Sequence, residues 1–248
     1  MPLANLKNVQ LDYLDEGKGF PVLLVHGFAS NSQVNWVNTG WVKLLTSNGY
    51  RVIAFDNRGH GKSRKFYNET DYSLAIMAAD AIALLDYLKI DKFHIIGYSM
   101  GARISVQLAL GQARRLAKII LAGNGYGMLE ETGDWTNVRD ALLAPSIDSV
   151  TDEKGRQFRA FADQTGADHR ALAACVMGVR EMFTEAQFRQ ITNQVLVAIG
   201  TKDTVAGSGE KLAVLMDHAE FLPIPGRDHM RAVGDKVFMQ GTLDFLAR

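Results

Sequence analysis

The amino-acid sequence predicts an α/β protein with a mostly parallel, twisted sheet that carries helices on both of its faces. Short runs rich in Val, Ile and Leu recur without strict alternation, which is typical of strands buried on both faces. Stretches with apolar residues at helical spacing lie between these runs. Such an alternation of strand and helix favours a parallel sheet covered on two sides. The expected strands span residues 21–27, 51–56, 92–99, 117–123, 194–200 and 219–226.

The first residues and three further stretches complete the predicted sheet and its helices. Residues 8–19 alternate and end at glycines, so they predict an antiparallel hairpin at one edge of the sheet. Residues 71–90 have apolar positions at helical spacing, and Asp71 or Ser73 can cap the start of that helix. The other helices expected around the sheet span residues 208–218 and 234–247.

The strand–helix rhythm is interrupted between residues 124 and 185, where no comparable strand is predicted. The segments within this stretch have helical patterns. A structured insertion of this length is usually a lid or cap rather than a loop. We therefore expect a core domain of residues 1–123 and 186–248 and a helical cap of residues 124–185. The helices expected within the cap span residues 134–143, 153–164 and 169–183.

Composition excludes several classes of partner. The chain has 27 basic and 27 acidic residues, so no long-range field favours nucleic acid or an anionic membrane. No apolar run approaches the roughly 20 residues that span a bilayer, and the first residues contain no apolar core of signal-peptide length. The one cysteine, Cys175, lies in an apolar segment and is expected to be buried. A reducing, cytoplasmic location fits this cysteine usage best.

Residues 55–63, with the sequence FDNRGHGKS, resemble part of a phosphate-binding loop. That loop needs a glycine five residues before its Gly-Lys-Ser, so that backbone amides can approach the phosphates. The position is occupied by Asp56, whose carboxylate would repel them. Residues 123–128 imitate a dinucleotide fingerprint but end in Met128 where the third glycine belongs. Neither stretch predicts nucleotide binding.

The stretch IIGYSMGARIS carries a stronger signal, because Gly97, Ser99 and Gly101 form a Gly-x-Ser-x-Gly pattern. A buried strand is predicted before it and a helix after it. A tight turn between strand and helix strains the central residue and requires small neighbours. Such a turn raises the Ser99 hydroxyl above the sheet, beside the positive end of the helix. Ser99 is therefore the candidate nucleophile.

A serine nucleophile needs a base, and in this chain order an acid and then a histidine should follow it. Asp203 and His229 each follow the end of a predicted strand, where open α/β sheets build their sites. Asp203 would hold the imidazole in the correct tautomer and stabilise its charged form. Asp228 is the rival acid, but its side chain should diverge from that of its neighbour. We favour Asp203.

The reaction also needs donors for a developing oxyanion. The backbone amides of Phe28, after an early strand, and of Met100, after the nucleophile, are the natural pair. His26 precedes Phe28, and we expect it to support that loop rather than to act as a second base. The sequence lacks His-Glu-x-x-His and paired-cysteine spacing, so no metal is predicted. Four apolar side chains of the predicted cap are candidates for the pocket lining: Trp135, Phe158, Met177 and Phe183.

Taken in order, these motifs resemble the α/β-hydrolase family with a Ser-His-Asp triad. The matching pieces are residues 26–28, 56–63 and 97–101, together with Asp203 and His229. The resemblance implies that residues 56–63 form a structural turn with no nucleotide, and that residues 124–185 cover the site. Relatives that cleave carbon–halogen or epoxide bonds carry aspartate where this chain has Ser99.

The expected function is a serine hydrolase that cleaves a small carboxylic ester, thioester or lactone and needs no cofactor. Two alternatives stay open. One is a carbon–carbon bond hydrolase of the same fold, although the tryptophan that often follows the histidine there is missing after His229. The other is a ligand sensor in which an intact triad turns over slowly. The partner is a small molecule in each case, and the oligomeric state is open.

Overall fold

A computed structural model describes residues 1–130 and 134–248, and its centre is a sheet of eight strands. The strand order is β1-β2-β4-β3-β5-β6-β7-β8, and every pair from β4 to β8 is parallel. The predicted fold class is therefore confirmed. The strands are β1 (Leu3–Asn5), β2 (Gln10–Gly17), β3 (Phe20–Val25), β4 (Tyr50–Phe55), β5 (Phe93–Tyr98), β6 (Leu116–Ala122), β7 (Gln194–Gly200) and β8 (Ala219–Ile224).

The antiparallel edge of the sheet differs in detail from the expected hairpin over residues 8–19. Strand β2 fills most of that range as one strand and pairs with β1 on one side and β4 on the other. Gly17 and Gly19 both have positive φ and turn the chain away from β2. The next strand, β3, is almost entirely apolar, so it lies between β4 and β5 in the buried centre instead of beside β2.

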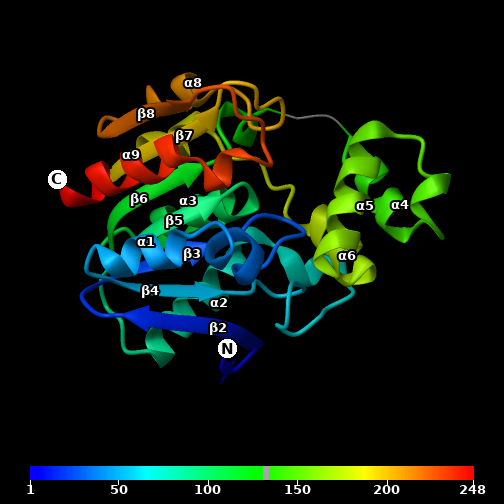
Figure 1. The fold of residues 1–248 in the computed structure, drawn as a ribbon, viewed down its shortest axis with the longest axis horizontal. Coiled ribbons are helices and arrows are strands. Elements are labelled where there is room, and N and C mark those ends of the chain that lie inside the picture. The colour runs from blue at the N-terminus through cyan, green and yellow to red at the C-terminus, as the bar shows by residue number, and fades with distance from the viewer. Residues whose placement is uncertain (131–133) are drawn as a thin grey trace.

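Helices cover both faces of the sheet, as Figure 1 shows. Helices α2, α3 and α8 pack on one face, and α1 and α9 pack on the other. The alternation along β3 shows why both faces must be covered: Leu23 and Val25 belong to one buried cluster, Val22 and Leu24 to the other. These helices are α1 (Trp41–Ser47), α2 (Leu74–Tyr87), α3 (Met100–Gln112), α8 (Gly209–Ala213) and α9 (Lys236–Ala247).

The ends of these helices refine the expectations from the sequence. Ser73, one of the two candidate caps, accepts a hydrogen bond from the backbone amide of Ile76 at the start of α2. Helix α8 is shorter than the expected range of 208–218, because the chain turns at Val214 and leads into β8. In the described residues, no helix is both long enough and apolar enough to span a bilayer.

Between β6 and β7 the described residues form helices and no strand. Figure 1 shows α4, α5 and α6 set apart from the sheet, beyond the carboxyl ends of its parallel strands. Helix α6 is shorter than the expected range of 169–183: it ends at Gly178, which packs closely on Glu69 and Tyr72. We call residues 134–189 the α4–α7 segment. Its helices are α4 (Thr136–Leu143), α5 (Glu153–Thr165), α6 (His169–Gly178) and α7 (Glu185–Arg189).

Short helical turns of other types join these elements. The stretch Gln33–Val37 is a π-turn, and four 3₁₀ turns occur among the described residues. The 3₁₀ turns span Glu69–Tyr72, Tyr126–Met128, Ile147–Ser149 and Ala232–Gly234.

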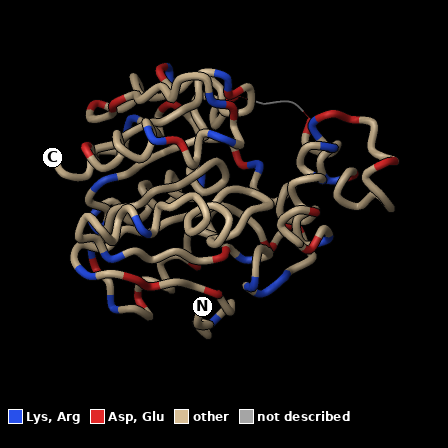
Figure 2. Tube along the Cα trace, in the orientation of Figure 1, with Lys and Arg blue, Asp and Glu red and all other residues tan. Residues whose placement is uncertain are grey.

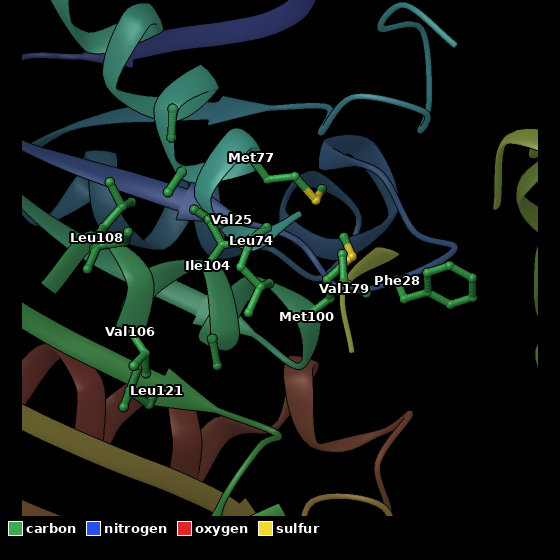
Figure 3. Packing of buried hydrophobic residues seen from close by; sticks show 14 of the residues in the cluster. Val25, Phe28, Leu74, Met77, Met100, Ile104, Val106, Leu108, Leu121 and Val179 are labelled. Carbon is green, nitrogen blue, oxygen red and sulfur yellow. The ribbon is translucent and has the colours of Figure 1, made fainter. Parts of the chain in front are cut away.

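The larger apolar cluster holds α3 firmly against the sheet. Figure 3 shows Ile104 of α3 near Val25 of β3, and Val106 of α3 beside Leu121 of β6. Complete burial of one such side chain stabilises the fold by about 1.5–3 kcal/mol. Phe28 lies at the margin of the cluster and extends away from it in Figure 3. This packing of α3 against the sheet fixes the position of the turn between β5 and α3.

Candidate active site

Ser99 occupies the sharp turn that the Gly-x-Ser-x-Gly pattern predicts. Its φ is 54° and its ψ is −112°, a strained conformation for a residue with a side chain. A Cβ atom at Gly97 would overlap the Gly101 carbonyl and the Ser105 hydroxyl, and one at Gly101 would overlap the Val25 carbonyl. Glycine is therefore required on both sides of the serine. The turn is the N-terminus of α3, so the helix dipole presents its positive end to Ser99.

His229 and Asp203 lie beside Ser99, although they are far from it in the sequence. The Nε2 atom of His229 lies 3.0 Å from the Ser99 Oγ, and its Nδ1 atom lies 2.8 Å from the Asp203 Oδ2. The other carboxylate oxygen of Asp203 accepts hydrogen bonds from the amides of Val205 and Ala206, at 2.8 and 2.9 Å. In geometry, the imidazole connects the serine hydroxyl to the carboxylate, as it must if it is to remove the hydroxyl proton while the carboxylate orients it.

The backbone of His229 is held from the sheet. The Tyr98 hydroxyl, at the end of β5, donates to the His229 carbonyl oxygen at 2.7 Å. Burial, with the nearby Asp203 carboxylate, raises the pKa of Tyr98 well above its usual range, so the hydroxyl stays protonated and remains a donor. The side chain of Asp203 is fully buried and that of His229 is 11% exposed. The imidazole is thus fixed in place while one edge still reaches the pocket.

Asp228, the rival acid, does not contact the imidazole ring. Its Oδ1 atom accepts hydrogen bonds from the backbone amides of Met230 and Arg231, at 3.1 and 2.9 Å. It therefore shapes the turn that carries His229, as short acidic side chains often do. Of the two carboxylates, Asp203 is the one that contacts the His229 ring.

The loop after β3 brings the Phe28 backbone into the same cavity wall as Ser99 and Met100. In the part of the chain that the structure describes, neither the Phe28 amide nor the Met100 amide donates to a protein acceptor. Ala29 adopts a positive φ of 59°, and the Asn35 side chain accepts a hydrogen bond from the Gly27 amide at 3.1 Å. The loop is thus held in one shape with two donors available for an oxyanion.

His26 has both ring nitrogens occupied by the backbone. Its Nδ1 lies 2.7 Å from the Gly27 carbonyl oxygen, and its Nε2 accepts from the Asn57 amide at 2.9 Å. Burial lowers the pKa of His26, which keeps the ring neutral in this arrangement. Its contacts are those of a structural support for the loop.

Asp56 shows why residues 56–63 do not form a phosphate-binding loop. Its carboxylate accepts hydrogen bonds from the Ser32 amide, the Ser32 hydroxyl and the Lys62 amide, at 2.8, 2.6 and 2.8 Å. The loop amide that would face a phosphate is thus already paired with a carboxylate. Arg58 forms a buried bidentate ion pair with Asp80, at 2.6 and 2.8 Å. The turn is a closed structural unit.

Within the part of the chain that the structure describes, two adjoining cavities include Ser99 in their lining. The larger has a volume of about 230 Å³ and is mostly apolar, and the smaller has a volume of about 30 Å³. Of the four predicted pocket residues, Phe158 lines both cavities and Trp135 lines the smaller one. Met177 and Phe183 line neither; Phe183 is buried against Phe188, with ring centroids 5.8 Å apart. These two side chains pack in or against the larger apolar cluster and do not line a pocket.

Several lining residues were not singled out from the sequence. Arg103 and Arg180 line the smaller cavity, and Asn35 and Phe161 line the larger one. Arg103 follows Ser99 by four residues at the start of a helix, a spacing that places both on one helix face. That spacing could have predicted from the sequence that Arg103 lies near Ser99. No sequence pattern predicts the position of Arg180, because it depends on the path of the chain after α6.

Comparison with known proteins identifies the family. The model of the alpha/beta hydrolase fold family matches residues 21–147, just over half of the chain. The chain therefore belongs to the alpha/beta hydrolase fold family, which confirms the resemblance drawn from its motifs.

Several relatives with assigned names are hydrolases, and others are named as non-heme chloroperoxidase or bromoperoxidase. "Putative carbamate hydrolase RutD" of Variovorax paradoxus is 26% identical over 229 residues, covering 82% of this chain and 84% of that protein. The 2-hydroxy-6-oxononadienedioate/2-hydroxy-6-oxononatrienedioate hydrolase of Paraburkholderia xenovorans is 38% identical over 121 residues, 48% of this chain and 41% of that protein. These matches support a hydrolase function and select no substrate.

Solved structures agree in fold over the whole chain. The enol-lactonase from Burkholderia xenovorans LB400 superposes with a TM-score of 0.85 at 21% identity, covering all of both chains. A meta-cleavage product hydrolase from Pseudomonas fluorescens IP01 superposes with a TM-score of 0.81 at 24% identity, covering 100% of this chain and 97% of the other. At these identities the likeness concerns the fold alone.

Proposed function

We propose that this protein is a serine hydrolase that cleaves a small carboxylic ester, thioester or lactone through an acyl-enzyme on Ser99. The observation that carries this proposal is the 3.0 Å contact between the His229 Nε2 and the Ser99 Oγ, with Asp203 bonded to the opposite ring nitrogen. A hydroxyl becomes a strong nucleophile when a positioned base removes its proton.

The chemistry follows from these contacts. Ser99 Oγ attacks the substrate carbonyl carbon while His229 Nε2 takes the hydroxyl proton, and Asp203 stabilises the imidazolium that forms. The carbonyl π electrons move to the oxygen, and the Phe28 and Met100 amides stabilise that oxyanion. The intermediate collapses, the bond to the leaving group breaks, and His229 protonates the leaving group. Water then attacks the acyl-enzyme by the same route and restores the Ser99 hydroxyl.

Residues 124–185 act in this proposal as the cap of the site, and residues 1–123 and 186–248 act as the core. Two contacts support this division of labour. The ring of Phe158 from α5 packs edge-on against that of Phe28, with centroids 5.8 Å apart. The Thr165 hydroxyl, at the end of α5, donates to the Ala29 carbonyl oxygen at 2.8 Å. Helix α5 thereby closes the larger cavity over the loop that carries the Phe28 amide.

Carbon–carbon bond hydrolysis is the second candidate. It is favoured by the 38% identity over 121 residues to a hydrolase named for a nonadienedioate. The same serine, histidine and oxyanion donors would serve, with a carbon atom as the leaving group. We rank it second because the match covers about half of the chain, and because no tryptophan follows His229 within the next ten residues.

The direct test replaces the nucleophile. Ser99→Ala should lower turnover of its best p-nitrophenyl ester by at least ~10³-fold, because attack by Oγ is lost. Ser149→Ala, which changes an exposed serine, is the matched control and should retain wild-type turnover. Circular dichroism and thermal melting show whether each variant is folded. A Ser99→Ala protein that retains near wild-type turnover would refute the proposal.

The same assay separates an enzyme from a sensor. A hydrolase releases p-nitrophenol in many multiples of the protein concentration at a steady rate. A slow sensor with an intact triad releases about one equivalent and then stops. Steady multiple turnover is the expected result, and a single equivalent from every ester would contradict it.

A further inference from the structure

Arg103 is placed where a positive charge is unfavourable. It lies in the first turn of α3. The helix dipole places partial positive charge at this end of the helix, which disfavours a second positive charge there. The residue is 6% exposed, so water does little to stabilise its charge. Its guanidinium donates to the Glu181 carbonyl oxygen and lies 5.6 Å from the centre of the Phe183 ring. Its Nε atom is buried with no hydrogen-bond partner in the described part of the chain.

Arg180 lies just after α6 and adds a second cation to the same wall. Its guanidinium carbon lies 4.1 Å from the centre of the Trp135 ring, and its Nε is also buried without a partner among the described residues. Within residues 1–130 and 134–248, neither Arg103 nor Arg180 forms an ion pair with a carboxylate. Burial lowers the pKa of Arg103, and attraction by the Glu181 carboxylate offsets part of that shift without forming an ion pair. In the described residues, two neighbouring guanidinium groups are therefore left without a paired carboxylate.

Arg103 and Arg180 differ from the buried Arg58 of the same molecule, because they have no carboxylate partner in the described residues. Figure 2 shows basic and acidic positions intermixed along the chain, in agreement with its zero net charge. The buried Arg58 has its carboxylate partner in Asp80. Burial lowers the pKa of Arg103 to about 10 and that of Arg180 to about 9, and Arg103 contributes to the second shift. Both groups still carry their charge at neutral pH, so an anion placed between them would be strongly attracted.

Both arginines line the small cavity that also includes Ser99 and Met100. Its volume of about 30 Å³ fits one small polar group, whereas the adjoining cavity of about 230 Å³ fits the apolar part of a substrate. Asn124 also lines the small cavity. An anion bound here would lie beside the nucleophile and not at a remote surface.

We propose that Arg103 and Arg180 bind a carboxylate carried by the substrate, so that the preferred substrate is a carboxylate-bearing ester, thioester or lactone. This inference rests on the proposed function of Ser99. A guanidinium matches a carboxylate through paired N–H donors, and charged hydrogen bonds of this kind are about twice as strong as neutral ones. The carboxylate would satisfy the free donors of both arginines and offset the repulsion between them.

The test compares half-esters with neutral esters of similar length. The substrates are the monoethyl esters of succinic, glutaric and adipic acids, each matched with a straight-chain ethyl alkanoate. We expect wild-type kcat/KM to favour at least one half-ester over its neutral match by ~10-fold or more. Arg180→Met and Arg103→Met should each reduce that ratio by ~10- to 100-fold, as expected for a lost charged hydrogen bond. The control Arg156→Met, an exposed arginine on α5, should leave the ratio unchanged.

Two outcomes would overturn the inference: a wild-type ratio near one across the series, or equal loss of both substrates in the arginine variants. Turnover of neutral esters that still depends on Ser99 would preserve the proposed function in either case.

A binding measurement covers the possibility that an arginine variant folds poorly. Calorimetry should detect succinate, glutarate or adipate binding to folded Ser99→Ala protein, and binding should weaken at least ~10-fold when Arg180→Met is added. Absence of binding by all three dianions to Ser99→Ala would also overturn the inference.

Discussion

The two walls that meet at Ser99 differ in whether their buried polar groups have hydrogen-bond partners. On the wall formed by the ends of β7 and β8, each group has a partner: Asp203 accepts two backbone amides and contacts His229, which in turn contacts Ser99. On the wall formed by α3 and the residues after α6, Arg103 and Arg180 have buried donors with no partner in the described residues. The first wall is complete without a ligand, and the second is not.

This difference suggests how the site divides its work. A satisfied network holds the reacting groups in one geometry, which is what proton transfer and nucleophilic attack require. Unpaired buried cations cost stability in the free protein, and that cost is recovered when an anion binds. In our account the paired wall performs the chemistry that the family shares, and the unpaired wall selects the substrate.

The largest expected effect tests the paired wall. Asp203→Asn should lower kcat by about 10²- to 10⁴-fold, because the amide group would favour the wrong tautomer of His229. The Asn carbonyl can still accept from Val205 and Ala206, so the fold should be retained. Steady-state kinetics on a neutral ester, together with a thermal melt, measure both effects.

Asp228→Asn is the matched control for this substitution. Asp228 accepts hydrogen bonds from two backbone amides near His229 and forms a loose, exposed ion pair with Arg231 at 3.8 Å. Its kcat should stay within about threefold of wild type, because its Asn carbonyl can accept the same bonds. If Asp228→Asn lost more activity than Asp203→Asn, the assignment of the acid would be wrong.

A smaller expected effect concerns the pH dependence of stability, to which the buried, neutral side chain of His60 contributes. His60 is fully buried, its Nδ1 lies 2.9 Å from the Arg58 carbonyl oxygen, and its Nε2 has no partner in the described residues. Burial, with a contribution from His26, lowers the pKa of His60 to about 3. Below pH 6.5 the unfolded chain therefore binds a proton at this position that the folded protein does not bind.

The sign of the pH effect follows from that difference. The depressed pKa means that stability is fully present above pH 6.5 and is lost as pH falls toward 3. Between pH 7.5 and 5, His60 alone should account for a loss on the order of 2 kcal/mol in the free energy of unfolding. His60→Gln can keep the bond to Arg58 and should flatten the pH dependence of urea unfolding by about this amount.

His218→Gln is the control, because His218 is exposed. It should leave the slope of stability against pH unchanged. Equal slopes for wild type and His60→Gln would show that His60 is not a buried neutral group whose proton uptake drives acid unfolding.

The sequence carried most of the information about the paired wall, for a physical reason. The strained turn at Ser99 can be made only with small flanking residues, so Gly97 and Gly101 mark it locally. Asp203 follows the buried strand β7 and His229 follows the edge strand β8, which has only one buried residue. Parallel strands bring their carboxyl ends to one edge. Apolar runs fix which strands are buried, and thus the position of the side chains that follow them.

The unpaired wall was less predictable, because it depends on packing between elements that are distant in sequence. Met177 and Phe183 have the same apolar character as Phe158, yet only Phe158 reaches the cavities. The docking of α5 on the Phe28 loop decides this, and one sequence does not specify it. The position of Arg180 depends on where α6 ends. The helical pattern predicted an end at residue 183, whereas the helix ends at Gly178.

The central claim, that His229 activates Ser99, is tested most directly by covalent labelling. Wild-type protein treated with a fluorophosphonate should gain one adduct, mapped by mass spectrometry to Ser99, as its esterase activity disappears. His229→Ala protein, if folded, should label at least ~100-fold more slowly, because its serine lacks a base. An adduct on another residue, or equal labelling rates in the two proteins, would contradict the account.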